Sequence, residues 1–501
     1  METAPFRRLN RPCMRVSAHA MVGVGRMLVA GALVAGGFVA GGLVAGGLSG
    51  CDMPERAPPA VDASPLAMAN ARLDAGPVIG SVTQTGARIW VHVAGIESVP
   101  GGSFAMRLIV EDPTATDQRA SDAIATIDSG GSAIFRVEGL RPGTNYNYRI
   151  IAARDEAPLA ASRLRTQPTR APETRIAFGS CADIDADTAR TWKAIENEHP
   201  DALVLLGDTP YIDTTGLAVQ RERYLRFAQA AGFASLVSKT PLYSVWDDHD
   251  FGANNTDGRL AGKSNSRRAF LENRPNPSYG EGAAGIFTSF RHGEVEVFLL
   301  DTRWFAGTEP SKGDPTKPTL LGEPQWRWLE SGLSKSKAAF KVVACGMVWN
   351  GLVTPDKSDC WGRYPHEFER FVRVLDATKA TGVVLVSGDV HRSRVIRHTT
   401  APLLGYDLME FVTSPLHGRV IAELDVRETA TPADDTKDTA LKNAGIAASV
   451  AFDQGEPNAF LLLDAETAAA GQGTLFARFV NAKGERFHTV QLPLDSLRRP
   501  R

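Results

Sequence analysis

The feature that most constrains the fold lies in the middle of the chain, where short apolar runs alternate with helical patterns. The runs are Ile176–Phe178, Ala202–Leu206, Leu242–Trp246, Val295–Leu300, Lys341–Ala344, Val383–Val386 and Leu408–Val412. Helical patterns at Asp187–His199, Glu323–Leu333 and Glu367–Lys379 lie between several of them. Strands that alternate with helices predict an α/β domain with a largely buried sheet.

Five of these runs are followed directly by a polar cluster. The clusters are Gly179-Ser180-Cys181-Ala182-Asp183, Gly207-Asp208-Thr209-Pro210-Tyr211, Asp247-Asp248-His249-Asp250, Asp301-Thr302-Arg303 and Gly388-Asp389-Val390-His391. In open α/β sheets, ligands bind beyond the carboxyl ends of the strands. One such cluster would mean little, because Gly-Asp ends many strands. Five in chain order, which together offer Asp, His, Cys and Tyr side chains, predict a metal site.

The composition is that of an ordinary globular chain. Of 501 residues, 43% are hydrophobic and 22% charged, and 55 Lys and Arg against 57 Asp and Glu leave a formal net charge of −2. This balance argues against a protein that binds nucleic acid through a basic field, so no specific nucleic-acid recognition is expected. Five cysteines are too few for a disulfide-built scaffold, so the core must come from apolar burial.

Residues 1–51 are typical of a bacterial export signal. Arginines precede the uncharged, Gly/Ala-rich run Met27–Leu48, which ends in Leu48-Ser49-Gly50-Cys51. That ending resembles a lipobox and predicts that Cys51 becomes the lipidated N-terminus; a plain transmembrane anchor is the alternative. Arg7-Arg8 leaves twin-arginine export open beside the general secretory route. We therefore expect a lipid-anchored protein on the periplasmic side of the cell envelope, with Asp52 resembling an inner-membrane retention signal.

Three further segments follow the signal. Residues 52–75 are proline-rich at first and predict a tether. Residues 76–167 have period two, with Ile89, Val91 and Val93 alternating, which predicts strands with one buried face. The stretch Gly139–Tyr146 resembles the tyrosine corner of fibronectin type III sandwiches, so we predict a β-sandwich domain. Residues 168–174 form the linker to an α/β domain over 175–495, which ends in a hairpin around Asn481-Ala482-Lys483-Gly484.

Three cysteines remain after signal removal and lipidation. They are Cys181, Cys345 and Cys360. One interpretation pairs Cys345 with Cys360 as a disulfide and leaves Cys181 for chemistry. The alternative is three reduced thiols, two of which fill the core.

Five sequence phrases, in this order, resemble the PhoD-type alkaline phosphatases of the calcineurin-like metallophosphoesterase superfamily. They are Phe178-Gly179-Ser180-Cys181, Leu206-Gly207-Asp208 with Tyr211, Trp246-Asp247-Asp248-His249-Asp250 with Asn254-Asn255, Leu300-Asp301-Thr302-Arg303 and Ser387-Gly388-Asp389-Val390-His391. The likeness extends over roughly residues 76 to 492. It implies a metallophosphoesterase-type mixed β sandwich flanked by helices in the catalytic domain, behind an N-terminal fibronectin-like all-β domain.

The resemblance also implies two unlike metals bridged by one carboxylate. The implied ligands are Cys181, Tyr211 and His391 at one site, Asp248, Asn255 and Asp389 at the other, and Asp208 as the bridge. A phenol ionises near neutral pH only beside a strongly polarising cation, so Fe³⁺ fits the first site, as the family is described. The oxygen donors of the second site suit Ca²⁺, with Mn²⁺ or Mg²⁺ as substitutes.

The implied activity is hydrolysis of small phosphate monoesters, with diesters as an extension, by attack of metal-bound hydroxide. His249 stands where the superfamily keeps a catalytic histidine, and we expect it to contact phosphate and protonate the leaving oxygen. Arg303 is a candidate phosphate clamp, because a guanidinium can engage two oxygens at once. A salt bridge of Arg303 to Asp301 or another carboxylate is the alternative. The expected membrane contact is the N-terminal lipid anchor.

Several assignments have simpler alternatives. Cys181 could be a buried small hydrophobe, Tyr211 could be core packing, and Asp248 could cap a helix. Asn254 competes with Asn255 for one ligand role. We interpret two further aspartates as orienting neighbours of the ligands, three tryptophans as a possible aromatic wall of the substrate pocket or plain packing, and one histidine as a candidate pocket residue. These are Asp247 and Asp250, Trp304, Trp349 and Trp361, and His417.

The sequence departs from the wider superfamily at two motifs. Cys181 replaces a histidine of the first motif, and Met347-Val348-Trp349-Asn350 offers no histidine where the fifth strand usually carries one. Both departures fit the PhoD branch. The competing functions are a phosphodiesterase or phospholipase D-like hydrolase on the same scaffold, and a surface binding lipoprotein without catalysis.

Overall fold

The computed structural model describes residues 71–114, 118–183, 188–349, 351, 357, 359–424, 445–467 and 472–500. All of them belong to one compact unit, Ala60–Arg501. The predicted export signal over residues 1–51, Cys51 included, and most of the predicted tether lie outside the described residues. Among the helices that are described, none is long and apolar enough to cross a bilayer.

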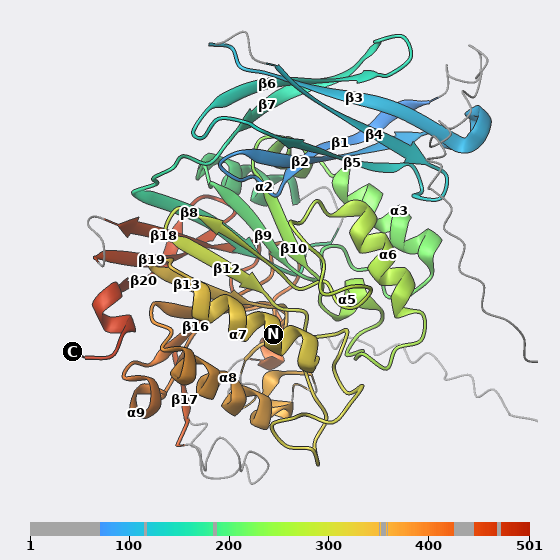
Figure 1. Cartoon of the computed structure of the whole chain (residues 1–501). Coiled ribbons are helices and arrows are strands. Elements are labelled where there is room, and N and C mark those ends of the chain that lie inside the picture. Colours follow the sequence, from blue (N-terminus) through green and yellow to red (C-terminus); the bar gives the residue numbers. More distant parts are fainter. Residues whose placement is uncertain are drawn as a thin grey trace, which may run out of the picture. The chain divides into compact units, whose positions relative to one another are not determined.

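The described strands form three sheets (Figure 1). The nine-stranded sheet has the order β20 (Arg486–Pro493), β19 (Gly473–Asn481), β18 (Ala459–Thr467), β8 (Glu173–Gly179), β9 (Ala202–Leu206), β10 (Leu242–Val245), β1 (Arg72–Gly80), β2 (Gly86–Ala94) and β5 (Ser132–Glu138). The seven-stranded sheet has the order β11 (Thr288–His292), β12 (Val295–Leu299), β13 (Phe340–Ala344), β14 (Val383–Ser387), β16 (Leu408–Thr413), β15 (Ser393–His398) and β17 (Ala448–Gln454). The four-stranded sheet has the order β4 (Gln118–Thr126), β3 (Ser103–Glu111), β6 (Asn145–Ala152) and β7 (Pro158–Arg165).

The helices are fewer and mostly short. They are α2 (Thr188–Asn197), α3 (Leu217–Ala228), α4 (Phe233–Val237), α5 (Asp248–Phe251), α6 (Lys263–Asn273), α7 (Gly322–Lys335), α8 (Pro365–Thr378) and α9 (Ala401–Leu404). The described part of the chain is therefore a mixed α/β protein with several sheets and few helices. This confirms the coarse fold class predicted from the alternating runs.

The two larger sheets carry parallel strands at their centres. β8, β9 and β10 are parallel neighbours in one sheet, and β12, β13, β14 and β16 are parallel in the other. All five residues of β9 are buried, because one face of the strand packs toward the second sheet and the other toward α2 and α4. Burial on both faces explains why these strands read as continuous apolar runs.

Helices α7 and α8 lie beside the seven-stranded sheet, as Figure 1 shows. In α7, Trp326, Leu329 and Leu333 recur every three to four residues and are buried, with Glu323 in the first turn and Lys335 in the last. α8 begins with proline in its first turn, where no backbone donor is needed. Both helices were predicted within two residues of their observed ends.

Strand β2 differs from the prediction of strands with one buried face. Ile89, Val91 and Val93 of β2 are buried in a core shared with β3 and β6, but Trp90 on the other face is fully buried as well. Its indole nitrogen donates to the carbonyl of Glu272 in α6, 2.8 Å away. The expectation of one buried face is therefore wrong for β2, because its outer face packs on elements more than a hundred residues away.

Other details of the N-terminal region can be compared directly. The hydroxyl of Tyr146 accepts from the backbone N–H of Arg141 at 2.7 Å, as in a tyrosine corner. β1 begins at Arg72, so the end of the predicted tether is paired strand, and β8 begins at Glu173, inside the predicted linker. The domain boundaries at 76–167 and 175–495 stay a prediction.

The C-terminal hairpin was predicted correctly. β19 and β20 are antiparallel, and Asn481 and Gly484 form the turn between them. The pattern missed the strands β11, β15 and β17 and the helices α3 and α6. Figure 1 shows these two helices side by side. These elements are short or carry mixed polar and apolar residues, so their periodicity is weak.

The three described cysteines are free and buried, so the predicted disulfide alternative is wrong. The sulfur of Cys345 lies 3.1 Å from the carbonyl oxygen of Met347, and that of Cys360 lies 3.7 Å from the carbonyl oxygen of Lys357. Each thiol is thus directed at a main-chain acceptor in its own loop. The alternative of reduced thiols describes the structure.

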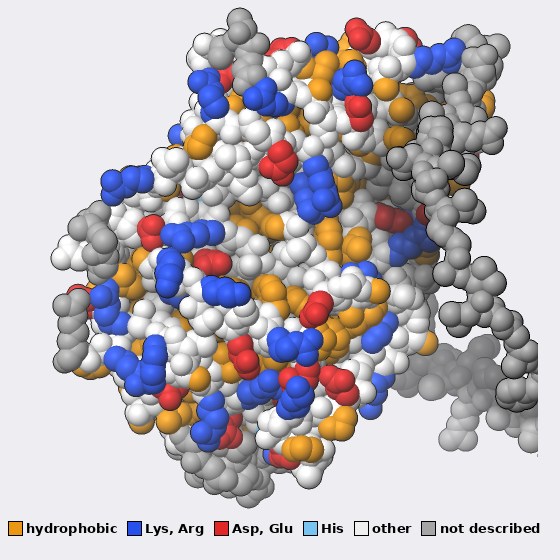
Figure 2. Space-filling view, viewed as in Figure 1, with side chains coloured by type: hydrophobic (Ala, Val, Ile, Leu, Met, Phe, Trp, Pro, Cys, Tyr) orange, Lys and Arg blue, Asp and Glu red, His pale blue; other side chains and the backbone are white. Residues whose placement is uncertain are grey.

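The surface carries both signs of charge. On the face shown in Figure 2, basic and acidic side chains are interspersed. Many form ion pairs, such as Arg107 with Asp122 at 2.7 Å. The mixture agrees with the near-zero formal net charge.

Candidate metal centre

The predicted site residues lie in loops that leave the carboxyl ends of central strands. Cys181 follows β8, Asp208 follows β9, Asp248 and His249 follow β10, and Asp389 and His391 follow β14. Strands far apart in the sequence thus deliver their polar clusters to one region, as the rule for open α/β sheets predicts.

The backbone of these loops is unusual. Among the described residues other than glycine, eleven have a positive φ, and five of those are predicted ligands. They are Cys181 (57°), Asp208 (53°), Asn255 (60°), Asp389 (70°) and His391 (51°). Such conformations cost about 1–3 kcal/mol each and concentrate at functional sites.

Glycines allow the loops to approach closely. A Cβ atom on Gly207, whose φ is 92°, would lie 2.3 Å from the backbone nitrogen of Asp247. A Cβ atom on Gly388 would lie 2.3 Å from the hydroxyl of Ser180. Both contacts are far inside van der Waals distance, so any larger side chain would push the strand ends apart.

Residues of the first predicted ligand group form two close pairs. The sulfur of Cys181 is 3.6 Å from Oδ2 of Asp208. The hydroxyl of Tyr211 is 2.9 Å from Nε2 of His391, while Nδ1 of His391 is 2.7 Å from the carbonyl oxygen of Arg419. Because a carbonyl can only accept, Nδ1 carries the hydrogen and Nε2 is the acceptor. Nε2 is therefore the atom of His391 that can coordinate a metal.

The pKa values of this group are strongly perturbed. Burial raises the pKa of the Cys181 thiol well above its usual range, and Asp208 adds to the shift. Burial, followed by the charges of Cys181 and Asp208, raises the pKa of Tyr211. Burial, followed by Asp248 and Asp247, raises the pKa of Asp208. The raised pKa values mean that the thiol, the phenol and the carboxyl group resist ionisation in this environment. A bound cation would favour their ionised forms.

The second group consists of carboxylates. Oxygens of Asp247, Asp248 and Asp389 lie within 4.8 Å of one another, and so do ligand atoms of Asp208, Asp248 and His249. Oδ2 of Asp247 and Oδ2 of Asp389 are buried and have no hydrogen-bond partner among the described residues. Buried carboxylate oxygens are normally paired, so these two fit hard divalent cations. Asp247, which we interpreted as an orienting neighbour of the ligands, is therefore also close enough to be a ligand itself.

Burial raises the pKa of Asp389 to about 6, although Lys357 opposes the shift. Burial also raises the pKa of Asp250 to about 7, against the backbone N–H of Asp247. For Asp248, burial is outweighed by Arg303 and His249, and its pKa falls to about 2. Asp248 is therefore the carboxylate of the cluster that is charged even without a cation.

Asp247, and not Asp248, caps α5. Its backbone N–H donates to Oδ1 of Asp250 at 2.6 Å in a capping box. Asp248 instead accepts the backbone N–H of His249 at 3.0 Å and that of Asn255 at 2.6 Å. The main chain of Asn255 is thus fixed beside Asp248, and the interpretation of Asp250 as an orienting neighbour fits its contact.

Arg303 is buried inside the cluster and forms the ion pairs of its alternative interpretation. Nη2 lies 2.5 Å from Oδ1 of Asp247 and Nη1 lies 2.8 Å from Oδ2 of Asp359, with 1% of its side chain exposed. Burial alone would lower the pKa of Arg303, but the charges of Asp247 and Asp248 have the larger effect and raise it, so the guanidinium stays charged. This geometry favours a structural role; phosphate contact by Arg303 stays a prediction without support here.

His249 is held by a residue that sequence reasoning missed. Nδ1 of His249 is 2.6 Å from Oδ1 of Asp213, and the backbone N–H groups of Ile212 and Asp213 both donate to the carbonyl of His249 at 2.9 Å. Nδ1 therefore carries the hydrogen, which leaves Nε2 for a ligand. Asp213 has a positive φ of 59°. Its place in the sequence, five residues after Asp208, is the signal that could have identified it.

Two more charged residues were missed. Nζ of Lys357 lies 2.8 Å from Oδ1 of Asp389 and 2.9 Å from Oδ1 of Asp359. Lys357 and Asp359 belong to the long connection between β13 and α8, and they lie several residues beyond its one discussed motif, Met347-Val348-Trp349-Asn350. Nothing local in the sequence marks them.

The tryptophans lie in two places. Trp349 and Trp361 are fully buried and stack at 4.3 Å between ring centroids, so the suggested aromatic wall is wrong for them, and packing against α8 is their role. Trp304 is partly buried beneath Nζ of Lys263, 4.5 Å from its ring centroid. His417 donates its backbone N–H to the carbonyl of Cys181 at 3.1 Å, so it lies at the rim of the centre.

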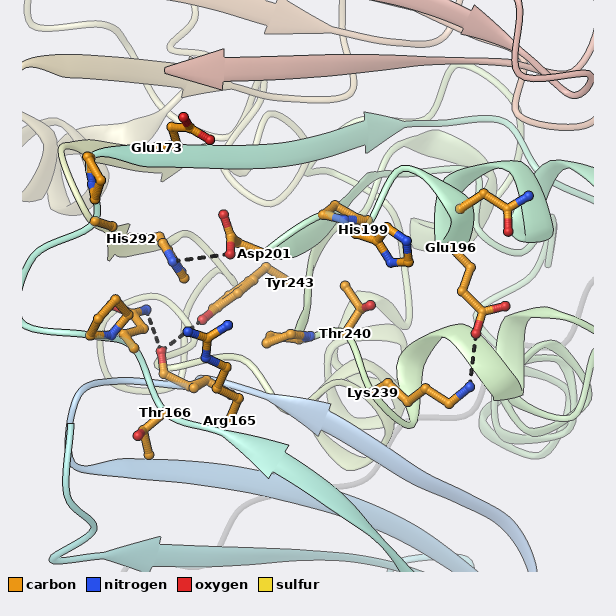
Figure 3. Close-up of a pocket in the computed structure, with 18 of the residues that line it drawn as sticks. Arg165, Thr166, Glu173, Glu196, His199, Asp201, Lys239, Thr240, Tyr243 and His292 are labelled. Carbon is orange, nitrogen blue, oxygen red and sulfur yellow. Dashed lines mark hydrogen bonds and ion pairs between the residues drawn. The ribbon is translucent and has the colours of Figure 1, made fainter. Parts of the chain in front are cut away.

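Two cavities lie away from the candidate metal centre. One of about 910 Å³ lies where the linker passes the amino ends of β9 and β10, with Asp201, Tyr243 and His292 among its lining residues (Figure 3). A second, of about 1100 Å³, shares the linker residues. None of the predicted catalytic or metal-binding residues lines either cavity. Figure 3 shows the pairing of Lys239 with Glu196 and of His292 with Asp201.

Buried parallel strands, few helices and an acidic cluster at the strand ends define a mixed α/β protein with a candidate metal centre. A comparison with protein families matches residues 176–456, more than half of the chain, to the PhoD-like phosphatase model. The chain belongs to the PhoD-like phosphatase family. This confirms the resemblance predicted from the five phrases.

Two relatives illustrate the likeness. Alkaline phosphatase D of Bacillus subtilis (strain 168) is 25% identical over 361 residues, which are 61% of this chain and 62% of that protein. The match thus spans less than two thirds of the relative's length. A solved structure described as that of PhoD superposes with a TM-score of 0.61 at 19% identity, covering 83% of this chain and 88% of that one. That likeness shows the shared fold.

Proposed function

We propose that this chain is a metal-dependent phosphohydrolase that acts on phosphate monoesters. Family membership supports a phosphoric ester hydrolase. The observation that carries the proposal is the cluster of buried carboxylates at the strand ends, with Oδ2 of Asp247 and Oδ2 of Asp389 lacking partners among the described residues. Ionised carboxylates this close together and this buried are stabilised when cations bind them.

The donor types suggest two unlike cations. Cys181, Tyr211 and His391 would hold Fe³⁺, and Asp248, Asn255 and Asp389 would hold Ca²⁺ or, as substitutes, Mn²⁺ or Mg²⁺, with Asp208 serving both. Sulfur, phenol and imidazole suit a transition metal, whereas carboxylate and amide oxygens suit a hard divalent cation. When bound, the cations would polarise the phosphoryl group and lower the pKa of a water molecule between them.

The chain's own residues supply orientation and proton transfer. Asp213 fixes the hydrogen of His249 on Nδ1, so Nε2 is directed away from Asp213 and can contact a phosphoryl oxygen or the leaving oxygen. Arg303 holds Asp247 and Asp359 in place through ion pairs. Asp250 fixes Asp247 through the capping box. These contacts keep the ligands oriented before substrate arrives.

The remaining sequence predictions complete the proposal. We infer an N-terminal fibronectin-like sandwich followed by a metallophosphoesterase-type catalytic domain, with small phosphate esters as substrates. We also infer export, lipidation at Cys51 and a position on the periplasmic side of the envelope. Labelled fatty acid recovered on the wild-type protein and absent from a Cys51→Ala variant would support the anchor; equal labelling of both would contradict it.

The metal assignment has a direct test. The purified protein is assayed with p-nitrophenyl phosphate while its metals are quantified, and its visible spectrum is recorded. We expect iron and calcium in similar amounts, turnover that chelation abolishes, and a charge-transfer band that disappears in Tyr211→Phe. A colourless, iron-free preparation with full activity would refute the Fe³⁺ assignment. Absence of turnover in a metal-loaded sample would refute the phosphatase.

A further inference from the structure

Lys357 is the second cationic side chain within the acidic cluster, and it differs from Arg303 in its access to solvent. Its Nζ contacts Asp389 at 2.8 Å and Asp359 at 2.9 Å, so it reaches a carboxylate of the candidate metal centre. Its side chain is 13% exposed, whereas that of Arg303 is 1% exposed. Lys357 is therefore the cation of this pair that a ligand can reach.

The hydrogen-bonding capacity of the two cations also differs. Arg303 directs Nε and Nη2 at Asp247, and Nη1 at Asp359 and at the carbonyl of Thr256. Nε and Nη1 donate hydrogen bonds to Asp247 and to Thr256, whereas Nη2 is buried and has only the ion pair with Asp247. An ammonium group has three donors, and the ion pairs of Lys357 with Asp389 and Asp359 direct at most two of them; the contact with Oδ1 of Asp359 is not a hydrogen bond. Within the described residues, no partner is recorded for the third.

The position of Lys357 relates it to the proposed reaction centre. It shares Asp389 with the predicted calcium site, and it interacts electrostatically with Asp248 and with His391, one candidate ligand from each metal site. A phosphoryl group bound between the two metal sites would lie beside the ammonium. Oδ2 of Asp389 stays available to a cation while Oδ1 pairs with Lys357, so both can be accommodated.

We propose that Lys357 contacts the phosphoryl group of the substrate and favours dianionic monoesters over monoanionic diesters. This inference rests on the proposed phosphohydrolase function. A monoester phosphoryl group has three non-bridging oxygens and two negative charges near neutral pH, whereas a diester has two such oxygens and one charge. A cation that contacts the third oxygen therefore stabilises a bound monoester more than a bound diester.

The test compares two substrates and one product. Lys357→Met and Lys357→Arg are assayed with p-nitrophenyl phosphate and bis(p-nitrophenyl) phosphate, and inorganic phosphate binding is measured by calorimetry on metal-loaded protein. In Lys357→Met we expect kcat/KM for the monoester to fall roughly tenfold to a hundredfold, and that for the diester by less than about threefold. Phosphate should bind about tenfold more weakly, and Lys357→Arg should restore most of that affinity.

Lys193→Met is the matched control. Lys193 is 63% exposed on α2 and pairs with Glu196 at 2.8 Å, so its substitution removes the same charge away from the centre. It should leave all three measurements unchanged. Metal content is determined in each sample, because loss of metal from Lys357→Met would make Lys357 a positioning residue of Asp389 and overturn the proposal.

Two further results would also overturn it. One is an equal loss on both substrates, and the other is unchanged phosphate affinity in Lys357→Met. If the wild type hydrolyses neither substrate, the proposed function fails, but phosphate binding by wild type and variant still decides whether Lys357 contacts a phosphoryl group.

Discussion

The two ends of the strands β8, β9 and β10 differ in how their charged side chains are paired. At the carboxyl ends, buried aspartates crowd together, and two of their oxygens lack partners among the described residues. At the amino ends, a cavity of about 910 Å³ is lined by residues of both signs. There Glu196 is paired with both Lys193 and Lys239, and His292 lies 3.7 Å from Asp201.

This difference shows that the volume of a cavity and its capacity to bind a charged ligand are separate properties. The amino-end cavity has room for a small molecule, but its Glu196 is already paired with Lys193 and Lys239, and ion pairs with such exposed lysines contribute little energy. At the carboxyl-end cluster, Arg303 and Lys357 pair with some of the carboxylate oxygens, but Oδ2 of Asp247 and Oδ2 of Asp389 stay buried without a hydrogen-bond partner among the described residues, a cost that a bound cation would offset. Unsatisfied buried charge therefore identifies the candidate centre better than volume does.

Two aspartates that flank one strand give the largest contrast. Asp201 precedes β9 and Asp208 follows it. We expect Asp208→Asn to lower kcat on p-nitrophenyl phosphate by at least about a thousandfold, because the only carboxylate proposed to serve both cations is lost. Asp201→Asn keeps an acceptor for the backbone N–H of Arg175 and should stay within about twofold of wild type. Comparable losses in the two variants would break the distinction between the strand ends.

Removal of metal should change how stability depends on pH. Burial raises the pKa of Asp389 to about 6 and that of Asp250 to about 7, both above the value of 3.8 for an ordinary aspartate. Each contribution to the stability of the metal-free protein is fully present below about pH 3.8 and is lost as the pH rises through 6 or 7. For Asp389 the loss is on the order of 3 kcal/mol.

Thermal unfolding of chelated and metal-loaded protein between pH 5 and pH 8 tests this. The stabilisation by metal should be larger at pH 8, because cations require the ionised carboxylates. The chelated Asp389→Asn variant should lose part of the pH dependence. A metal-induced shift that is equal at both pH values would show that these carboxylates do not bind the cations.

The sequence predicted those parts of the fold that carry a local pattern. β9, β14 and the hairpin of β19 and β20 were located because buried strands read as apolar runs and the turn contains Asn and Gly. The burial of Trp90 was missed, because a period-two strand does not reveal whether its second face meets solvent or α6. Pairing of β1 with β10 involves a single register pair, Gly80 with Leu242, which no local pattern marks.

The same reason divides the site. Cys181, Asp208, Asp389 and His391 directly follow apolar runs, so their convergence followed from strand order. Lys357 lies in a connection without periodicity, and its proximity to Asp389 depends on how that connection folds back. The roles of these residues as ligands stay a prediction.

Asp213 gives a smaller effect at the carboxyl end. Asp213→Asn removes the charge that holds Nδ1 of His249 at 2.6 Å but keeps the size of the side chain. We expect kcat to fall roughly tenfold to a hundredfold, with KM and metal content near wild type, because His249 loses its fixed orientation. Asp213→Glu should recover part of the rate. A change in KM alone would mean that Asp213 shapes the substrate pocket instead.

The smallest effect is expected at the amino end. Glu196→Gln breaks the pairs with Lys193 and Lys239 at 2.8 and 2.9 Å, yet both lysines are at least 60% exposed and water replaces the lost contacts. The free energy of unfolding should fall by less than about 1 kcal/mol, less still at high salt, and kcat should not change. Calorimetric unfolding at two salt concentrations measures the first effect and the nitrophenyl phosphate assay the second. A large loss of activity would mean that the amino-end cavity is coupled to the centre, so that paired charges would no longer distinguish a structural cavity from a functional one.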